Sequence, residues 1–109
     1  MEIQVGNLPR PLRKKDISEK LVDVCGKNDI VFMAIFGSFV RKEQNSRSDI
    51  DIAIEFDKKK RKSLLDLVRV ENELTEIFGR KVDVGIFSRL SPHVAKDVER
   101  EMRLIYEKR

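Results

Sequence analysis

Apolar residues recur along this chain at two different spacings, one typical of helices and the other of strands. Between residues 16 and 25 the apolar positions are spaced as on one face of a helix. These positions are Ile17, Leu21, Val24 and Cys25. Gly26 follows where a helix would end. A continuous apolar run then covers residues 30–36, rich in branched and aromatic side chains. Such a run predicts a strand buried on both faces.

Two later segments alternate between apolar and polar or small residues, which is the pattern of strands with two different faces. In residues 49–56, the positions on one face are Ile50, Ile52, Ile54 and Phe56. The positions on the other face are Asp49, Asp51, Ala53 and Glu55. In residues 82–87, Val82, Val84 and Ile86 lie opposite Asp83, Gly85 and Phe87. Each segment therefore predicts a strand with one aliphatic face.

Two further helices are predicted, one between these strands and one after them. Ser63 and Asp66 have the spacing of a helix N-terminal cap, and Gly79 has the position of a C-cap. The expected inner stripe is Leu64, Leu67, Val68, Leu74, Ile77 and Phe78. Ser91 and Pro92 are typical of a helix start, and the last helix is expected to run to about Tyr106.

The connections between these elements restrict the topology. About a dozen residues separate the first two strands, too few for a parallel crossover, so these strands are expected to pair antiparallel. The second and third strands enclose a helix, which predicts a right-handed parallel unit. We therefore expect an α/β (α+β) fold, a small mixed sheet with helices packed on it. The 109 residues suit a single domain, 1–109.

Composition excludes several classes of protein. The longest apolar run has seven residues, too short to span a membrane, and no signal peptide is visible, so a soluble cytoplasmic protein is expected. Cys25 is the only cysteine, which excludes an intrachain disulfide. The formal net charge is +4, with a basic run at residues 58–62. A solvated turn explains this run more simply than a phosphate-bearing partner, the alternative interpretation.

Three carboxylates form the main candidate site. Asp49 and Asp51 are alternate residues of one strand, about 6.6 Å apart along it, on the same face. Asp83 lies on the non-aliphatic face of the next strand and could come alongside them. Each carboxylate alone is an ordinary exposed strand residue. Together they would repel one another unless a divalent cation bound between them, and carboxylate oxygens suit Mg²⁺.

Gly37 and Ser38 end the first strand just before this carboxylate pair. A glycine at a strand end lets the backbone approach a ligand closely. A serine that opens a short helix offers a hydroxyl and backbone N–H groups to a phosphate. Metal-assisted phosphoryl or nucleotidyl transfer uses hydrogen-bond donors to a phosphate beside a cluster of carboxylates.

These residues resemble a known family. Gly37-Ser38, ten intervening residues and Asp49-Ile50-Asp51 are similar to the Gly-Ser…Asp-x-Asp signature of the DNA polymerase β-like nucleotidyltransferases. The short chain looks like the minimal nucleotidyltransferase (MNT) group, and Asp83 fits its third carboxylate. The resemblance covers about residues 30–87. One departure is Lys42, which stands where relatives commonly carry a second glycine.

The resemblance implies transfer of AMP from ATP to a hydroxyl, with two Mg²⁺ ions and release of pyrophosphate. The implied catalytic residues and metal ligands are Asp49, Asp51 and Asp83. The implied nucleotide-binding residues are Gly37, Ser38, Arg41 and Ser48, with Arg47 as an alternative to Arg41.

The resemblance also implies a partner. MNT proteins are similar to the antitoxin half of toxin–antitoxin systems whose toxin is a HEPN ribonuclease, which the antitoxin adenylylates. Because the chain has no second domain to complete the site, a partner or a second copy of the chain is expected to do so. Three alternatives stay open: an antitoxin that acts by binding alone, a nucleotidyltransferase acting on RNA or a small molecule, and a basic nucleic-acid-binding module.

Overall fold

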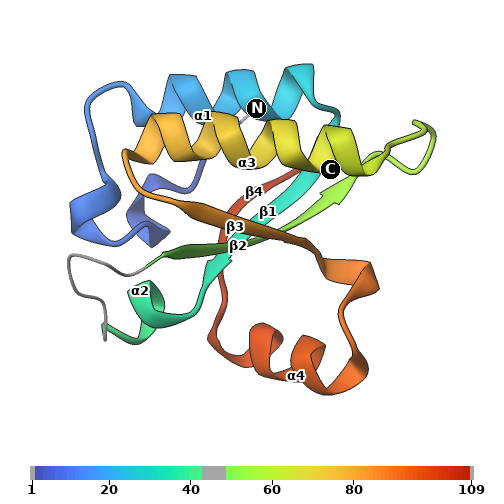
Figure 1. Ribbon diagram of the computed structural model, residues 1–109. Helices are drawn as coiled ribbons and strands as arrows, with labels where there is room; N and C mark the ends of the chain where they lie inside the picture. Colours follow the sequence, from blue (N-terminus) through green and yellow to red (C-terminus); the bar gives the residue numbers. More distant parts are fainter. Residues whose placement is uncertain (1, 43–48, 109) are drawn as a thin grey trace.

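A four-stranded mixed sheet with strand order β3-β2-β1-β4 forms the centre of the fold (Figure 1). The computed structural model describes residues 2–42 and 49–108. The strands are β1 (Ile30–Phe36), β2 (Ile50–Phe56), β3 (Val82–Ile86) and β4 (Arg103–Glu107). Strand β1 pairs antiparallel with β2 and β4, whereas β2 and β3 are parallel. The predicted mixed sheet and both predicted pairings are confirmed.

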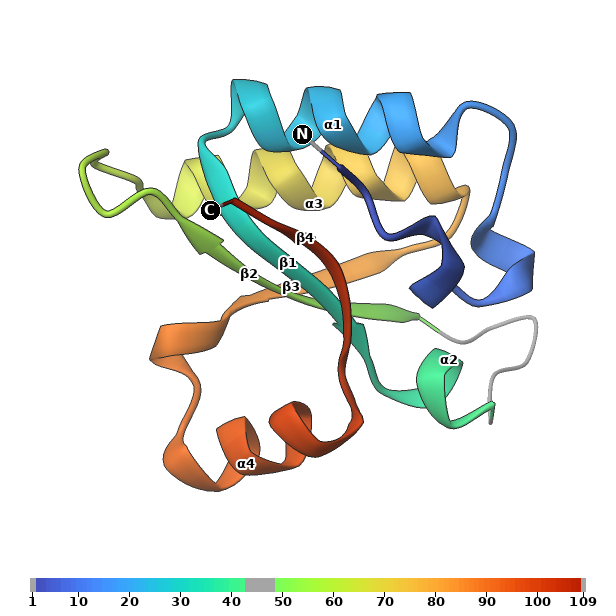
Figure 2. The ribbon, with the colours of Figure 1, turned by 180° about the vertical axis from the view of Figure 1, so that it is seen from behind.

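The helices lie on both sides of this sheet. They are α1 (Ile17–Lys27), α2 (Ser38–Arg41), α3 (Leu64–Phe78) and α4 (Pro92–Glu101), with 3-10 turns at Val5–Asn7, Arg10–Leu12 and Phe87–Arg89. Helices α1 and α3 lie side by side over one face, and α4 lies beyond the opposite face (Figures 1 and 2). Among the described residues, no helix combines the length and hydropathy needed to cross a membrane.

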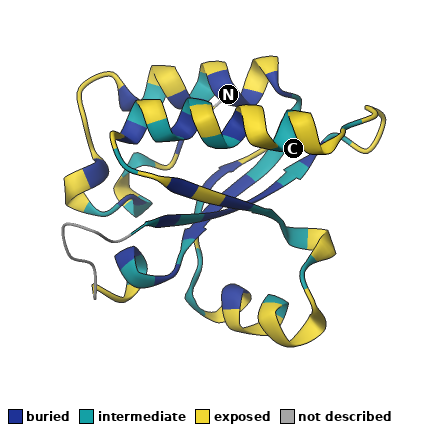
Figure 3. Cartoon of the chain, viewed as in Figure 1, coloured by how far each residue is buried: buried dark blue, intermediate teal, exposed yellow. Residues whose placement is uncertain are grey.

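The hydrophobic core lies between the sheet and the layer formed by α1 and α3 (Figure 3). It includes Leu21, Met33, Ile35, Ile52, Ile54 and Leu74, all fully buried. Each such side chain contributes about 1.5–3 kcal/mol through burial. Cys25 packs in this core as a small hydrophobe, and burial raises the pKa of its thiol to about 12. The first residues of the chain also contribute, since Leu8 and Leu12 are buried.

The predicted start and end of α3 and the predicted start of α4 are confirmed by their caps. The backbone N–H of Ser63 donates to the Asp66 carboxylate over 2.7 Å, which completes a capping box at the start of α3. Gly79 ends this helix in the left-handed conformation, with φ 70°. The Ser91 hydroxyl accepts from the backbone N–H of Val94, and Pro92 occupies the first turn of α4.

The end of the last helix was predicted incorrectly. Helix α4 ends at Glu101 rather than near Tyr106, and residues 103–107 form the edge strand β4. Strand β1 has a second edge, and pairing along it satisfies backbone groups that a longer helix would leave exposed on that strand. Ile105 and Tyr106 are buried as a result. The first helix also runs one residue past Gly26, to Lys27, and β3 ends at Ile86 rather than at residue 87.

The inner stripe of α3 was predicted only in part. Val70, Leu74 and Phe78 are buried, with Leu67 and Ile77 partly buried against the core. Leu64 is 73% exposed and Val68 is 40% exposed, which corrects their assignment to the core. Val68 lies one residue off the buried stripe, and Leu64 lies in the first turn of the helix.

Replacing leucines of α3 by alanine tests this description of the core. We expect Leu74→Ala to lower the free energy of unfolding by about 2–5 kcal/mol, because it opens a cavity in the core. The matched change Leu64→Ala should alter it by less than about 0.5 kcal/mol, since that side chain is exposed. Urea denaturation followed by circular dichroism measures both. Equal losses from the two variants would contradict the packing described here.

Candidate active site

The three predicted carboxylates lie on neighbouring strands at one end of the sheet. Asp51 is in β2, Asp83 is in β3, and the parallel register pairs them directly. Because paired residues of neighbouring strands project from the same face, both carboxylates lie on the face opposite the aliphatic core. Asp49 immediately precedes β2, two residues before Asp51. The topology therefore places all three acids together on the side of the sheet away from α1 and α3.

Electrostatic repulsion within this group acts mainly on Asp51. Its side chain is half-buried, whereas Asp83 is exposed. Burial raises the pKa of Asp51, and the negative charges of Asp83 and Asp49 raise it further. The positive charge of Arg41 acts in the opposite direction. An ionised Asp51 is therefore held at a cost in free energy that a bound cation would remove.

The donor set suits Mg²⁺ in its chemistry, since it consists of carboxylate oxygens on a face open to water and substrate. Within residues 2–42 and 49–108, however, no three acidic, histidine or cysteine side chains are already close enough to hold a metal ion. The carboxylates therefore lie on neighbouring strands in register, but their side chains do not converge on one metal position.

Gly37 connects β1 to α2 and lies directly against Asp51. It is buried, with φ 82° and ψ −155°, a conformation that side chains rarely adopt. A Cβ atom at this position would overlap the Asp51 carboxylate. The antiparallel register explains the approach, because Asp51 is opposite Phe36, the residue before Gly37. The strand-end glycine predicted to allow a close approach does so toward a site carboxylate.

Glu101 is part of this site, although sequence reasoning missed it. The backbone N–H of Gly37 donates to Glu101 Oε1 over 3.0 Å. Arg41 Nη1 donates to both carboxylate oxygens of Glu101, over 3.0 and 3.1 Å. Glu101 shares one face of α4 with Val94 and Val98, and this helical spacing was the one available signal. Nothing in the sequence connects that face to Gly37, 64 residues away.

The remaining predicted residues are placed as follows. Ser38 and Arg41 are the first and last residues of α2, next to Gly37. Ser48 and Arg47 lie outside the described residues. Lys42, at the position where the resemblance led us to expect a glycine, has φ 60° and ends α2 in the left-handed conformation. Glycine adopts this conformation at no steric cost, whereas lysine carries a penalty of about 1–2 kcal/mol. Lys42 therefore adopts the left-handed backbone conformation that a glycine would adopt at this position.

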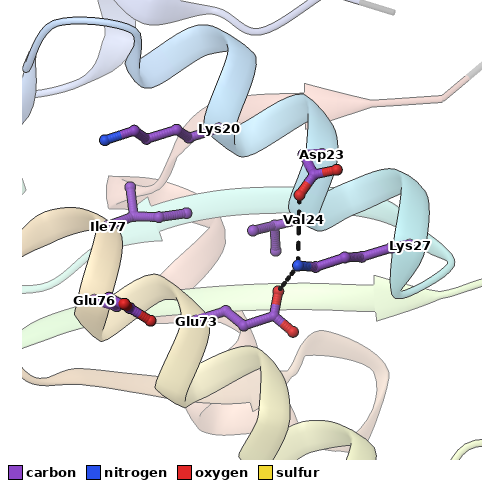
Figure 4. A pocket seen from close by; sticks show the side chains of 7 residues that line it. All are labelled: Lys20, Asp23, Val24, Lys27, Glu73, Glu76 and Ile77. Atoms are coloured by element: carbon purple, nitrogen blue, oxygen red, sulfur yellow. Dashed lines mark ion pairs between the residues drawn. The ribbon is translucent and has the colours of Figure 1, made fainter.

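A pocket elsewhere on the molecule is unrelated to these carboxylates. It lies between α1 and α3, on the helix layer, and its lining is shown in Figure 4. Lys27 Nζ lies 3.1 Å from Glu73 and 3.4 Å from Asp23, so these three of the charges that face the pocket are paired with one another. The predicted acids instead lie on the opposite side of the sheet.

The mixed sheet, with Asp51 and Asp83 in register beside the Gly37-Ser38 turn, has the arrangement that the resemblance to nucleotidyltransferases led us to expect. The chain belongs to the polymerase β nucleotidyltransferase family, whose profile, "Polymerase beta, Nucleotidyltransferase", matches residues 19–109. The family predicted from the Gly-Ser and Asp-x-Asp motifs is therefore confirmed.

Two curated relatives are similar over most of their length. MJ0435 of Methanocaldococcus jannaschii, provisionally named a protein adenylyltransferase, is 43% identical over 77 residues, 71% of this chain and 81% of that protein. Protein adenylyltransferase MntA of Thermococcus cleftensis is 35% identical over 89 residues, 82% of this chain and 81% of that protein.

Solved structures share the fold at lower identity. A toxin–antitoxin crystal structure with AMP-PNP has a TM-score of 0.69, with 18% identity, over 84% of this chain and 73% of that chain. A complex of tri-AMPylated Shewanella oneidensis HEPN toxin with MNT antitoxin has a TM-score of 0.61, with 16% identity, over 83% of this chain and 69% of that chain. At these identities the two structures establish the fold alone.

Substituting glycines tests the close approach at the site. Gly37→Ala should lower the free energy of unfolding by about 1–3 kcal/mol, because it forces a strained backbone and a clash with Asp51. Gly26→Ala is the matched control: it lies within α1, and its Cβ would meet nothing within 4 Å. There the same change should stabilise the protein by about 0.5–1 kcal/mol. Urea denaturation measures the free energy of unfolding of both variants. An unchanged value for Gly37→Ala would contradict this geometry.

The raised pKa of Asp51 predicts a pH dependence of stability. An acid whose pKa is raised by folding opposes folding when ionised, and this effect vanishes below the ordinary pKa of about 3.9, where both states are protonated. Asp51→Asn should therefore raise the melting temperature at pH 7 in metal-free buffer, and the gain should shrink as the pH falls toward 4. Asp23→Asn, at an exposed site on α1, should show no such gain. A lower melting temperature for Asp51→Asn at pH 7 would contradict the repulsion described above.

Proposed function

We propose that this protein is a Mg²⁺-dependent nucleotidyltransferase that transfers AMP from ATP to a hydroxyl group of a protein. The observation that carries the proposal is the register of Asp51 and Asp83 on one face, with the backbone of Gly37 packed against Asp51. The acids therefore lie next to groups that could donate hydrogen bonds to a phosphate, and transfer of a nucleotidyl group would use both.

Asp49, Asp51 and Asp83 would hold the metal ions. Bound Mg²⁺ supplies Lewis-acid stabilisation of the triphosphate and lowers the pKa of the acceptor hydroxyl. The N–H of Gly37 and the guanidinium of Arg41 would take the charge of the terminal phosphates, with Ser38 adding a hydroxyl. The acceptor oxygen would attack the α-phosphorus, the bond between that phosphorus and the pyrophosphate oxygen would break, and pyrophosphate would leave. Asp83 would complete the metal site on the acceptor side or help to take the proton of the acceptor hydroxyl.

A macromolecular acceptor fits the exposure of the site. The Asp83 side chain is 50% exposed, so a large partner can reach it. The relative MntA carries the name protein adenylyltransferase, and a structure of the same fold pairs an MNT antitoxin with an AMPylated HEPN toxin. These likenesses support a HEPN toxin as the acceptor and an antitoxin role for this chain.

Incubation of the purified chain with ATP, Mg²⁺ and a HEPN-domain protein tests the proposal. Intact-protein mass spectrometry should detect AMP on the HEPN chain with the wild type, and EDTA should abolish it. Asp51→Asn should reduce the rate by at least about 100-fold, because it removes a metal ligand from the reacting centre. Asp23→Asn, which changes an exposed acid of α1, on the other side of the sheet, should transfer AMP at the wild-type rate.

The same variants distinguish transfer from binding. If Asp49→Asn neutralises the toxin fully in cells and no AMP adduct forms, the protein acts as an antitoxin by binding alone. If AMP appears instead on RNA or a small-molecule hydroxyl, the nucleotidyl transfer stands and the protein acceptor is wrong.

A further inference from the structure

The carboxylate of Glu101 occupies two groups that the proposed function assigns to ATP. Glu101 is the last residue of α4, and its side chain is 26% exposed. It accepts from the Gly37 N–H over 3.0 Å and pairs with Arg41 Nη1 over 3.0 Å. These donors would otherwise face the terminal phosphates of the nucleotide.

A carboxylate and a phosphate compete for such donors because both present anionic oxygens to the same N–H groups. The Gly37 N–H cannot hold Glu101 at 3.0 Å and a phosphate oxygen at once. We infer that Glu101 acts as an internal substitute for the terminal phosphates of ATP, and that nucleotide binding requires its carboxylate to leave Gly37. This inference rests on the proposed function and adds a mode of regulation to the same site.

The surroundings of Glu101 favour its displacement. Its charge is one of those that raise the pKa of Asp51, so it adds to the repulsion among the site acids. Incoming triphosphate with Mg²⁺ would provide Asp51 with a cation and Arg41 with a new anion. Release of Glu101 therefore removes one like-charge interaction while both donors keep a partner.

The side chain has space to move. Glu101 and Arg41 line an open hollow of about 460 Å³ between the end of β1 and α4. The other residues that line it are Phe36, Val94, Asp97, Val98 and Arg100. Rotation about the side-chain bonds of Glu101 into this hollow leaves α4 and β4 in place. The carboxylate can thus exchange with a ligand without unfolding the chain.

Nucleotide affinity measured by isothermal titration calorimetry tests the inference. Glu101→Ala should lower the dissociation constant for ATP with Mg²⁺ by about fivefold to tenfold, as expected when one competing charged hydrogen-bond acceptor is removed. Affinity for AMP, which lacks the β- and γ-phosphates, should change by less than about twofold, because only screened long-range charge is altered.

Two further variants serve as controls. Glu99→Ala removes the same charge from an exposed position on the same helix and should leave ATP affinity at the wild-type value. Glu101→Gln keeps the size of the side chain and should tighten ATP binding in the same direction by a smaller factor. Melting temperatures of all variants establish that each is folded under the titration conditions.

The outcomes separate this inference from the proposed function. If the wild type binds ATP and Glu101→Ala binds it no more tightly, Glu101 supports the site and does not block it. Equal tightening of ATP and AMP would also overturn the inference, since the effect would then be general electrostatics. If neither the wild type nor Glu101→Ala nor Glu101→Gln binds ATP with Mg²⁺, the proposed function itself fails.

Discussion

The close contact between the backbone at Gly37 and the carboxylate of Asp51 is the constraint on which the site depends. It exists because β1 and β2 pair antiparallel, so that the end of one strand lies opposite the second residue of the other. No side chain fits between them. The same contact brings the Gly37 N–H, Arg41 and the acids of β2 and β3 into one region. A change in strand register by one residue would move Asp51 to the core face and remove the site entirely.

Much of this arrangement could be predicted from the sequence because it is encoded locally. Period-two alternation in residues 49–56 located β2 and assigned Asp49 and Asp51 to the face opposite Ile50 and Ile52. The helix between β2 and β3 required a parallel crossover, which brought Asp83 alongside. These steps use only the spacing of residues and the length of connections. The Gly-Ser and Asp-x-Asp motifs then identified the family.

What could not be predicted depends on contacts between distant segments. Ser91 and Pro92 indicated where the last helix begins, but its end was expected near residue 106. Residues 103–107 instead pair with the free edge of β1 and form β4. This pairing satisfies backbone hydrogen-bonding groups of β1, an effect that the local sequence pattern does not indicate. Because the end of α4 was misassigned, the role of Glu101 at the site was also missed. Its role follows from where α4 ends, and that end is set by the strand that follows it.

The two faces of the sheet differ in charge, and this difference explains how the fold remains stable despite repulsion among the site acids. One face of β2 and β3 buries branched side chains against α1 and α3, which provides the free energy that holds the strands in register. The opposite face can therefore carry acids that repel one another, since that repulsion is small compared with burial of the core. Arg41 offsets part of this repulsion, and its ion pair with Glu101 connects α2 to α4. A ligand that brings both cations and phosphates can replace that pair, and stability is thereby linked to occupancy of the site.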